Sequence, residues 1–377
     1  MYGKERTYAK INIGAFLHNI EYIRKKISKD TKLCAVIKTN GYGHGAVKLA
    51  KAAKDRVDYF AVATIWEGVE LRNSGIDNDI LVLGYTFKEN YEEYLKYNIK
   101  ATIFDYNAAK ELSEMAINME TTANIHIKID TGMNRIGYSC DKDYILDSIN
   151  EIVKISKLQN IKIEGIFTHF ASADKSDKRL SNIQEQKFMN VIEQLRKNNI
   201  EIENCHCSNS AGVIGDIGTK MNMVRVGIIL YGLEPSEEMV NEYEELKPVM
   251  SIKSKIVYIK EVSAGQSVSY GETYTTSKTT KIATIPIGYG DGYPRNLSNK
   301  GYVLVKGQRA DIVGRVCMDY CMVDVSSIEG VEVYDEVTLI GKDGNNKIKV
   351  EDMARLAGTF NYEFVCNIGS RVTRIYE

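Results

Sequence analysis

The sequence predicts an α/β fold, a (β/α)8 TIM barrel followed by a second, mostly β C-terminal domain. Two observations predict it. Short apolar runs alternate with helical patterns over about 230 residues, and β-rich runs with turn signals replace that alternation near residues 242–246. A chain of 377 residues is also long for a single compact core. We expect the barrel at 8–243 and the β-rich domain at 244–377, with residues 1–7 joined to the second domain.

Eight runs in the first part are apolar almost throughout, as expected for parallel strands buried on both faces. They are Leu33–Lys38, Tyr59–Thr64, Ile80–Tyr85, Ala101–Asp105, Ile125–Asp130, Ile163–His169, Asn204–Asn209 and Met223–Tyr231. Helical patterns lie between them, as at Ala46–Lys54, Ala108–Met119, Lys142–Lys157 and Asn182–Lys197. One strand and one helix per repeat is the unit of a parallel barrel.

The second part contains alternating or β-branched runs bounded by turn residues, the pattern of half-buried strands. The predicted strands are Met250–Lys260, Lys281–Pro286, Tyr302–Val305, Ala310–Val313, Met322–Val325 and Asp335–Gly341. One helical stretch, Val350–Ala357, interrupts them.

The composition excludes several classes of function. The net charge of −1 gives no basic field for nucleic acid, and no apolar run approaches the roughly 20 residues of a membrane span. Met1–Thr7 is polar and resembles no signal peptide. The seven cysteines are odd in number and lack zinc spacing, so we expect reduced thiols, a cytoplasmic protein and no metal site.

Polar residues follow five of the predicted strands, where TIM barrels build their active sites. They are Lys38-Thr39-Asn40, Asp130-Thr131-Gly132, His169, Asn209-Ser210 and Arg225. Burial disfavours the charged form of a lysine, so Lys38 at the end of a buried strand is a candidate Schiff-base nucleophile. The alternative is a lysine that emerges into solvent at the barrel rim, and this residue alone does not decide between the two.

The segment Ala35-Val-Ile-Lys38-Thr-Asn-Gly-Tyr42-Gly-His44-Gly45 resembles the pyridoxal-5′-phosphate (PLP) lysine motif of bacterial alanine racemases. The likeness extends along essentially the whole chain, in family order. The other matching segments are Lys128–Gly137, Thr168–Ala171, Ser208–Gly212, Val224–Ile228, Val268–Gly271, Pro286–Arg295, Gly314–Asp319 and Asn361–Glu363. The resemblance implies a fold-type III PLP enzyme that racemises L- and D-alanine, supplies D-alanine for peptidoglycan, and works as a head-to-tail homodimer with shared active sites.

The resemblance also implies how the cofactor is held. Lys38 would carry PLP covalently, and Arg225 would face its ring nitrogen. A guanidinium stays protonated and hardly transfers a proton to the ring, which weakens PLP as an electron sink and suits racemisation. The phosphate would be bound by Ser210, the N–H groups of Gly227 and Ile228, and the hydroxyls of Tyr42 and Tyr362, with Asn209 and His169 completing the cofactor site.

Racemisation requires a base on each face of the substrate Cα. The resemblance makes Lys38 one base and Tyr270 of the partner subunit the other. An unperturbed phenol has a pKa of about 10, too high for a base at neutral pH, and cationic neighbours lower such a value. By the family pattern, His169 hydrogen-bonds this tyrosine and Arg225 contacts His169.

The substrate carboxylate would be bound by Arg135 and by the backbone N–H of Met318, with Tyr289 on the access path. The resemblance suggests that Lys128 is carbamylated and that the resulting anion holds Arg135 in place. The alternative for Lys128 and Arg135 is two cations that point to solvent. We interpret His126 as a strand residue, and we assign no chemistry to His206.

Five positions depart from the family pattern: Gly41, Asn134, Gly290, Tyr320 and Thr373. Tyr320 lies two residues from Met318 and would reshape the substrate pocket. The vancomycin-resistance serine racemases share this catalytic unit behind a membrane domain, so serine racemisation is the alternative activity. The non-enzyme alternative is a PLP carrier protein, against which the second domain argues.

Overall fold

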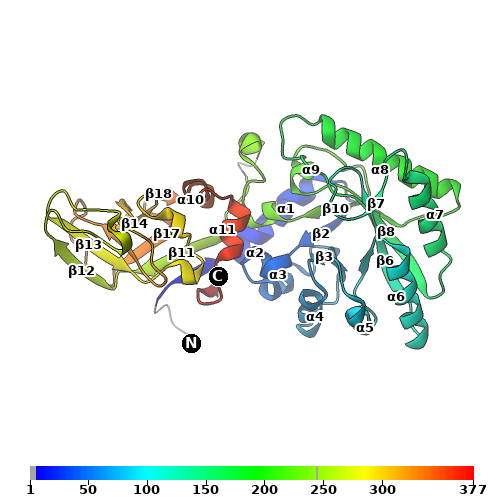
Figure 1. Ribbon diagram of the computed structural model, residues 1–377, viewed down its shortest axis with the longest axis horizontal. Helices are drawn as coiled ribbons and strands as arrows, with labels where there is room; N and C mark the ends of the chain where they lie inside the picture. Colours follow the sequence, from blue (N-terminus) through cyan, green and yellow to red (C-terminus); the bar gives the residue numbers. More distant parts are fainter. Residues whose placement is uncertain (1–5, 243–244) are drawn as a thin grey trace.

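The computed structural model describes residues 6–242 and 245–377. Eight parallel strands form the barrel, which lies on the right of Figure 1 in blue to green. They are β2 (Lys32–Val36), β3 (Tyr59–Val62), β4 (Asp79–Val82), β5 (Ala101–Ile103), β6 (Ala123–Asp130), β8 (Ile161–Phe167), β9 (Asn204–His206) and β10 (Met223–Val226). The predicted (β/α)8 fold is confirmed.

The ring of strands consists of two arcs. One arc runs β10-β2-β3-β4 and the other β5-β6-β8-β9, with the short β7 (Tyr138–Ser139) beside β6. A parallel bridge between Leu81 and Lys100 joins β4 to β5, and the Arg225 N–H donates to the Ser208 carbonyl at 3.0 Å where the ring closes. The predicted strand Met223–Tyr231 is too long, because the chain leaves the sheet at Gly227 and Ile228–Tyr231 forms the 3₁₀ helix η2.

Helices cover the outside of the barrel (Figure 1). They are α1 (Ile13–Lys26), α3 (Ala46–Ala53), α4 (Ile65–Asn73), α5 (Tyr91–Lys96), α6 (Tyr106–Asn118), α7 (Ile145–Ile155) and α8 (Arg179–Lys197). In α7 the buried side chains Ile149, Ile152 and Ile155 recur every three residues, which places them on one face. Two short helices that follow strands, α2 (Lys38–Tyr42) and α9 (Ser210–Ile214), carry predicted site residues.

The β domain lies on the left of Figure 1. Its larger sheet has the order β15-β14-β17-β11-β1-β19, with β18 on β17, and its smaller sheet has the order β12-β13-β16. The strands are β1 (Tyr8–Ile11), β11 (Met250–Lys255), β12 (Tyr258–Val262), β13 (Thr280–Ile285), β14 (Tyr302–Val305), β15 (Gln308–Asp311), β16 (Cys321–Asp324), β17 (Glu336–Asp343), β18 (Asn346–Ile348) and β19 (Thr373–Tyr376). Helices α10 (Val350–Ala357) and α11 (Asn361–Asn367) lie between this domain and the barrel.

Two expectations for this domain are wrong in detail. The predicted strand Met250–Lys260 is two strands, β11 and β12, which belong to different sheets. Strand β1 was assigned to the barrel, but it pairs antiparallel with β11 and parallel with β19 in the β domain. Both differences concern the strand with which another strand pairs. A local pattern of apolar residues does not specify a pairing partner that lies far away in the sequence. Within the described residues, no helix has the length and apolar character needed to cross a membrane.

Candidate active site

The turn after β2 presents Lys38 at the mouth of the barrel. The next four residues, Thr39 to Tyr42, all have left-handed backbone angles, with φ of 54°, 51°, 61° and 50°. Such angles cost a non-glycine residue about 1–2 kcal/mol each, so the surroundings must hold the turn. Glu67 Oε1 accepts from the Thr39 N–H at 2.5 Å, and Asn40 Oδ1 accepts from the Ala46 N–H at 2.9 Å. At Gly41 the departure from alanine eases this conformation.

Lys38 itself is half-buried, and its pKa lies below the usual lysine value. Burial is the main cause, and the charge of Arg135 adds to it. A larger fraction of the amine is therefore neutral at neutral pH, which a nucleophile or a base requires.

A second group of site residues surrounds Gly227, where β10 ends. The Gly227 N–H donates to Ser210 Oγ at 2.9 Å, and a Cβ on Gly227 would lie 2.5 Å from Tyr42 Oη. Ser210 begins α9, and Asn209 Oδ1 accepts from the Gly212 N–H at 2.9 Å as the helix cap. A hydroxyl, a phenol and a side-chain-free backbone thus meet at one place, the chemistry that binds a phosphate.

Tyr42 lies between two further aromatic rings. Its ring centroid is 6.2 Å from that of the predicted ligand Tyr362 on α11 and 4.8 Å from that of Tyr231. Tyr231 is fully buried and its hydroxyl donates to the Val36 carbonyl at 3.1 Å. The ring contacts fix the position of the Tyr42 hydroxyl beside Gly227.

Arg225 points into the barrel and is almost completely buried. Its guanidinium contacts His206 Nδ1 at 2.7 Å and His169 Nδ1 at 3.3 Å, and it donates to the Thr168 carbonyl at 2.7 Å. It also lies 5.0 Å from the centroid of the Phe167 ring. Burial lowers the pKa of Arg225 to about 10, so the group stays protonated at neutral pH. Arg225 is therefore not a solvent-exposed arginine.

Lys128 and Arg135 differ in environment. Lys128 is buried, with Nζ 4.9 Å from the Phe167 centroid and 3.3 Å from the Ile129 carbonyl oxygen that it donates to. Burial and the charge of Arg225 lower the pKa of Lys128 to about 7. Arg135 is exposed on a loop that Asp130 organises. The Asp130 carboxylate accepts hydrogen bonds from the backbone N–H groups of four loop residues: Gly132, Met133, Asn134 and Arg135. Asn134 takes a positive φ of 56°, which asparagine tolerates.

The predicted site residues of the β domain are on its surface. Tyr270 is 71% exposed, Met318 53% and Tyr289 44%. Tyr289 and Met318 lie together, since the Gly290 N–H donates to the Met318 carbonyl at 2.9 Å. A Cβ at Gly290 would lie 2.7 Å from Arg371 Nη1, at the end of a flexible side chain, and 3.0 Å from the Met318 carbonyl oxygen. Tyr270 begins the 3₁₀ helix η4 (Tyr270–Glu272), which lies in the connection between β12 and β13 of the β domain.

The predicted site is therefore divided. Lys38, Tyr42, His169, Ser210, Arg225 and Gly227 gather in the barrel. In the described part of the chain, no hydrogen bond, ion pair or ring contact links Tyr270, Tyr289 or Met318 with Lys38 or Arg225. Three residues behind Arg225 were missed or given no role: His206, His126 and Glu164. The alternation of His126 and Lys128 on one strand, which turns both toward the barrel interior, was the available signal.

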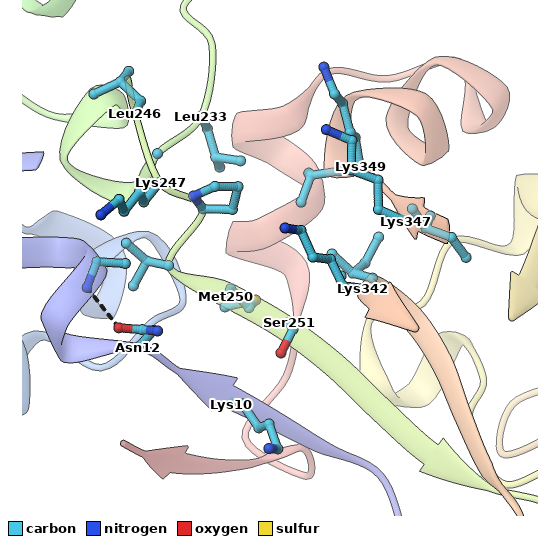
Figure 2. A pocket seen from close by; sticks show the side chains of 18 of the residues that line it. Lys10, Asn12, Leu233, Leu246, Lys247, Met250, Ser251, Lys342, Lys347 and Lys349 are labelled. Atoms are coloured by element: carbon cyan, nitrogen blue, oxygen red, sulfur yellow. Dashed lines mark hydrogen bonds between the residues drawn. The ribbon is translucent and has the colours of Figure 1, made fainter. Parts of the chain in front are cut away.

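A separate cavity of about 980 Å³ lies where the barrel meets the β domain. Figure 2 shows the lysines around it: Lys10, Lys247, Lys342, Lys347 and Lys349. Its lining contains none of the predicted site residues. The candidate active site therefore rests on the side-chain geometry at the barrel mouth and not on this cavity.

Comparison with known proteins places this geometry in context. The family described as "Alanine racemase, N-terminal domain" matches residues 11–235, and "Alanine racemase, C-terminal domain" matches 249–376. An alanine racemase of Desulforamulus reducens is 45% identical over 99% of both chains. Among solved structures, an alanine racemase of Clostridium difficile 630 has a TM-score of 0.92 and 42% identity over 98% of this chain and 95% of that one. The alanine racemase of Bartonella henselae with covalently bound pyridoxal phosphate has a TM-score of 0.87 and 28% identity over 99% of each chain.

A barrel with a lysine at its mouth, joined to a β domain and matched to these relatives along its whole length, defines an amino-acid racemase, which is an isomerase. Within that class the chain belongs to the alanine racemase family. The alternatives of a serine racemase and of a PLP carrier are not favoured, because relatives that are similar over nearly the full length are alanine racemases.

Proposed function

We propose that this protein interconverts L- and D-alanine with PLP as its cofactor, using Lys38 and Tyr270 of a partner subunit as the two bases. The observation that carries the proposal is a lysine of lowered pKa at the barrel mouth, together with a buried arginine and a phosphate-type pocket. The relatives' names support alanine as the substrate.

The residues present fit the cofactor. A Cβ on Gly227 would fill the space beside Tyr42 Oη, so the backbone there is open to a phosphate. Ser210 Oγ and the N–H groups of Gly227 and Ile228 would bind that phosphate with Tyr42 and Tyr362. Lys38 would form the covalent link, and Arg225 would donate to the ring nitrogen. Bound PLP supplies the electron withdrawal that acidifies the substrate Cα–H.

The chain's own residues then move the proton. Lys38 Nζ, freed when substrate binds, accepts or delivers a proton on one face of Cα, and the phenol oxygen of Tyr270 does so on the other. Arg135 and the N–H of Met318 hold the substrate carboxylate, which fixes the plane between the two bases. Arg225 donates to His169 Nδ1, so the His169 proton lies on Nε2 and is available to the phenol oxygen.

The position of Tyr270 supports a second subunit. In one chain the phenol is 71% exposed and belongs to the β domain, whereas Lys38 belongs to the barrel. A head-to-tail homodimer would place the β domain of each subunit against the barrel mouth of the other and complete two sites. The aromatic side chains of Trp66, Tyr85 and Phe87 in the barrel are exposed in a single chain. Their exposure supports burial of this part of the barrel in a dimer. We also propose a cytoplasmic location, supported by seven free cysteines.

The test is a racemisation assay with L-alanine and L-serine, compared by kcat/KM. We expect alanine to exceed serine by at least about tenfold, since a pocket must provide a hydrogen bond to accept a hydroxyl. Tyr320, which departs from the family pattern, is 48% exposed near Met318, and Tyr320→Gln tests its influence on that ratio. A higher kcat/KM for serine would refute the substrate assignment, and no racemisation of either would refute the function.

A further inference from the structure

Arg225 carries a buried positive charge without a carboxylate partner in the described residues. Its hydrogen-bonding partners are carbonyl groups and the rings of His206 and His169, and the Phe167 ring lies 5.0 Å away. Behind His206 the contacts continue. His206 Nε2 lies 2.9 Å from His126 Nδ1, and His126 Nε2 lies 3.7 Å from Glu164 Oε1. Both rings are fully buried.

The direction of this chain of contacts follows from hydrogen-bond chemistry. A guanidinium only donates, so His206 Nδ1 must be an unprotonated acceptor. A neutral His206 then has its proton on Nε2 and donates to His126 Nδ1. His126 in turn has its proton on Nε2, directed at the Glu164 carboxylate. With neutral rings, this assignment satisfies the hydrogen bonds between Arg225, His206 and His126, and it turns the His126 Nε2–H toward Glu164 Oε1 at 3.7 Å, a charge contact longer than a hydrogen bond.

The surroundings of the two histidines and of Glu164 favour neutral imidazole rings and an ionised carboxylate. Burial lowers the pKa of His126 and, with the charge of Arg225, holds that of His206 well below the usual value. Burial alone would raise the pKa of Glu164, but His126, Tyr59 and Lys100 lower it to about 2. The Tyr59 hydroxyl donates to Glu164 Oε1 at 2.5 Å, and Lys100 Nζ lies 3.5 Å from Oε2.

The backbone is shaped to seat this chain of side chains. The pairing of β6 with β8 shifts register here, since Ile125 pairs with Ile163 and His126 with Gly165, which leaves Glu164 as the extra residue of a bulge. A Cβ on Gly165 would lie 2.2 Å from His126 Nδ1. Phe167 stacks on His206 with centroids 4.9 Å apart and an interplanar angle of 3°. A bulge, a glycine and a stacked ring thus fix the two imidazoles.

We propose that Glu164 is a positioning residue that acts on Arg225 through His126 and His206, by fixing both rings in the tautomer that turns an unprotonated Nδ1 toward the guanidinium. Arg225 favours this tautomer from one end of the chain of contacts and the carboxylate favours it from the other, so loss of the carboxylate removes one of the two constraints and admits the other tautomer. A proton on His206 Nδ1 would then face the guanidinium and displace it. The catalytic part of this inference rests on the proposed function, since it assumes that Arg225 faces the cofactor ring. The tautomers do not depend on that function.

The first test is nitrogen NMR of the ¹⁵N-histidine-labelled full chain, with and without PLP. Five histidines make the spectrum simple to assign. We expect His126, His169 and His206 to be neutral and protonated on Nε2. His44 is the internal control with the opposite tautomer, because its Nδ1 must donate to the Tyr42 carbonyl at 2.8 Å. A proton on Nδ1 of His206 or His126 would overturn the proposal without any variant.

The second test uses Glu164→Gln, which keeps the size of the side chain and loses its charge. We expect mixed tautomers at His126 and His206 and a fall in kcat of about tenfold with KM for alanine little changed, since small misplacements of a site group have effects of this order. Asp79→Asn is the matched control, because Asp79 Oδ1 contacts the same Lys100 Nζ at 2.8 Å but does not face His126. Unchanged tautomers in Glu164→Gln would reject the role of Glu164.

Gly165→Ala provides an independent variant should Glu164→Gln not fold, because it displaces the His126 ring and leaves every group of the chain present. We expect the same loss of fixed tautomers, and wild-type tautomers there would contradict the proposal. The two hypotheses fail separately. An inactive protein with the expected tautomers rejects the proposed function alone, and an active racemase with other tautomers rejects this inference alone.

Discussion

The barrel mouth and the surface of the β domain contribute to the same proposed reaction but are built in opposite ways. Around Arg225 and Gly227, side chains are buried, hydrogen-bonded to one another and held by strand ends. Around Tyr270, Tyr289 and Met318, side chains are exposed. The barrel region is organised within one chain. The exposed side chains of the β domain are available for contact with another subunit.

This difference in burial affects which side chains can act as bases within a single chain. Lowered pKa values require burial and nearby charge, and a single chain provides both for Lys38 and Lys128. Tyr270 is exposed in the single chain, so under the proposed function it would act as a base only after it enters the cationic mouth of another barrel. Under the proposed function, assembly and activity are therefore linked.

Lys38→Ala should have the largest effect, and it tests the barrel region. Removal of the amine abolishes both the covalent link to PLP and one base, so we expect the absorption band of the lysine-bound cofactor to disappear and racemisation to fall by about 1,000-fold or more. Lys32→Ala, at the opposite end of β2 and paired with Glu203, is the matched control. An unchanged spectrum in Lys38→Ala would refute the cofactor site.

Tyr270→Phe tests the exposed region. We expect the cofactor spectrum to persist and racemisation to fall by about 100-fold or more, because acid–base groups contribute effects of this order. Tyr258→Phe, an exposed tyrosine on β12, serves as the control. Near-full rates in both directions would reject the two-base assignment.

Mixing the two inactive variants tests whether Lys38 and Tyr270 of one site come from different subunits. If sites are shared, a dimer of one Lys38→Ala and one Tyr270→Phe subunit has one site with both wild-type groups. Random exchange should then restore about a quarter of wild-type activity. No recovery after verified exchange would place both groups in one chain and contradict the proposed head-to-tail arrangement.

Gly227→Ala tests how tightly the barrel region is organised. The new Cβ would lie 2.5 Å from Tyr42 Oη, and overpacking of this kind costs about 1–3 kcal/mol. We expect PLP affinity to weaken by about 10- to 100-fold, measured by fluorescence titration of the apoprotein. Gly369→Ala is the control, since its Cβ would meet nothing closer than 3.5 Å. Equal PLP affinity in the two variants would place the phosphate elsewhere.

The sequence predicted the barrel well because its strands are short, local and apolar, and the residues at their ends recur in order. It could not predict partners. Strand β1 lies in the sheet of the other domain, and β11 and β12 separate into two sheets, because pairing depends on strands far away in sequence. Likewise Glu164 faces His126, and through it connects to His206 and Arg225, only because a bulge places it there. Isolated residues gave no sign of that contact.

The smallest expected effect concerns Lys128, the buried amine of the barrel region. A carbamate forms when the neutral amine nitrogen bonds to the carbon of CO₂ and the displaced proton goes to water. The pKa of Lys128 is lowered to about 7, so the neutral fraction, and with it the carbamate, should increase as the pH rises through that value and be lost below it. We expect a ¹³C carbamate signal from labelled bicarbonate at pH 8 that is absent in Lys128→Met and retained in Lys253→Met, a buried lysine of the β domain. Because a carbamate would only hold Arg135 in place, Lys128→Met should lower kcat/KM by about tenfold. The same signal in Lys128→Met would place the modification on another amine.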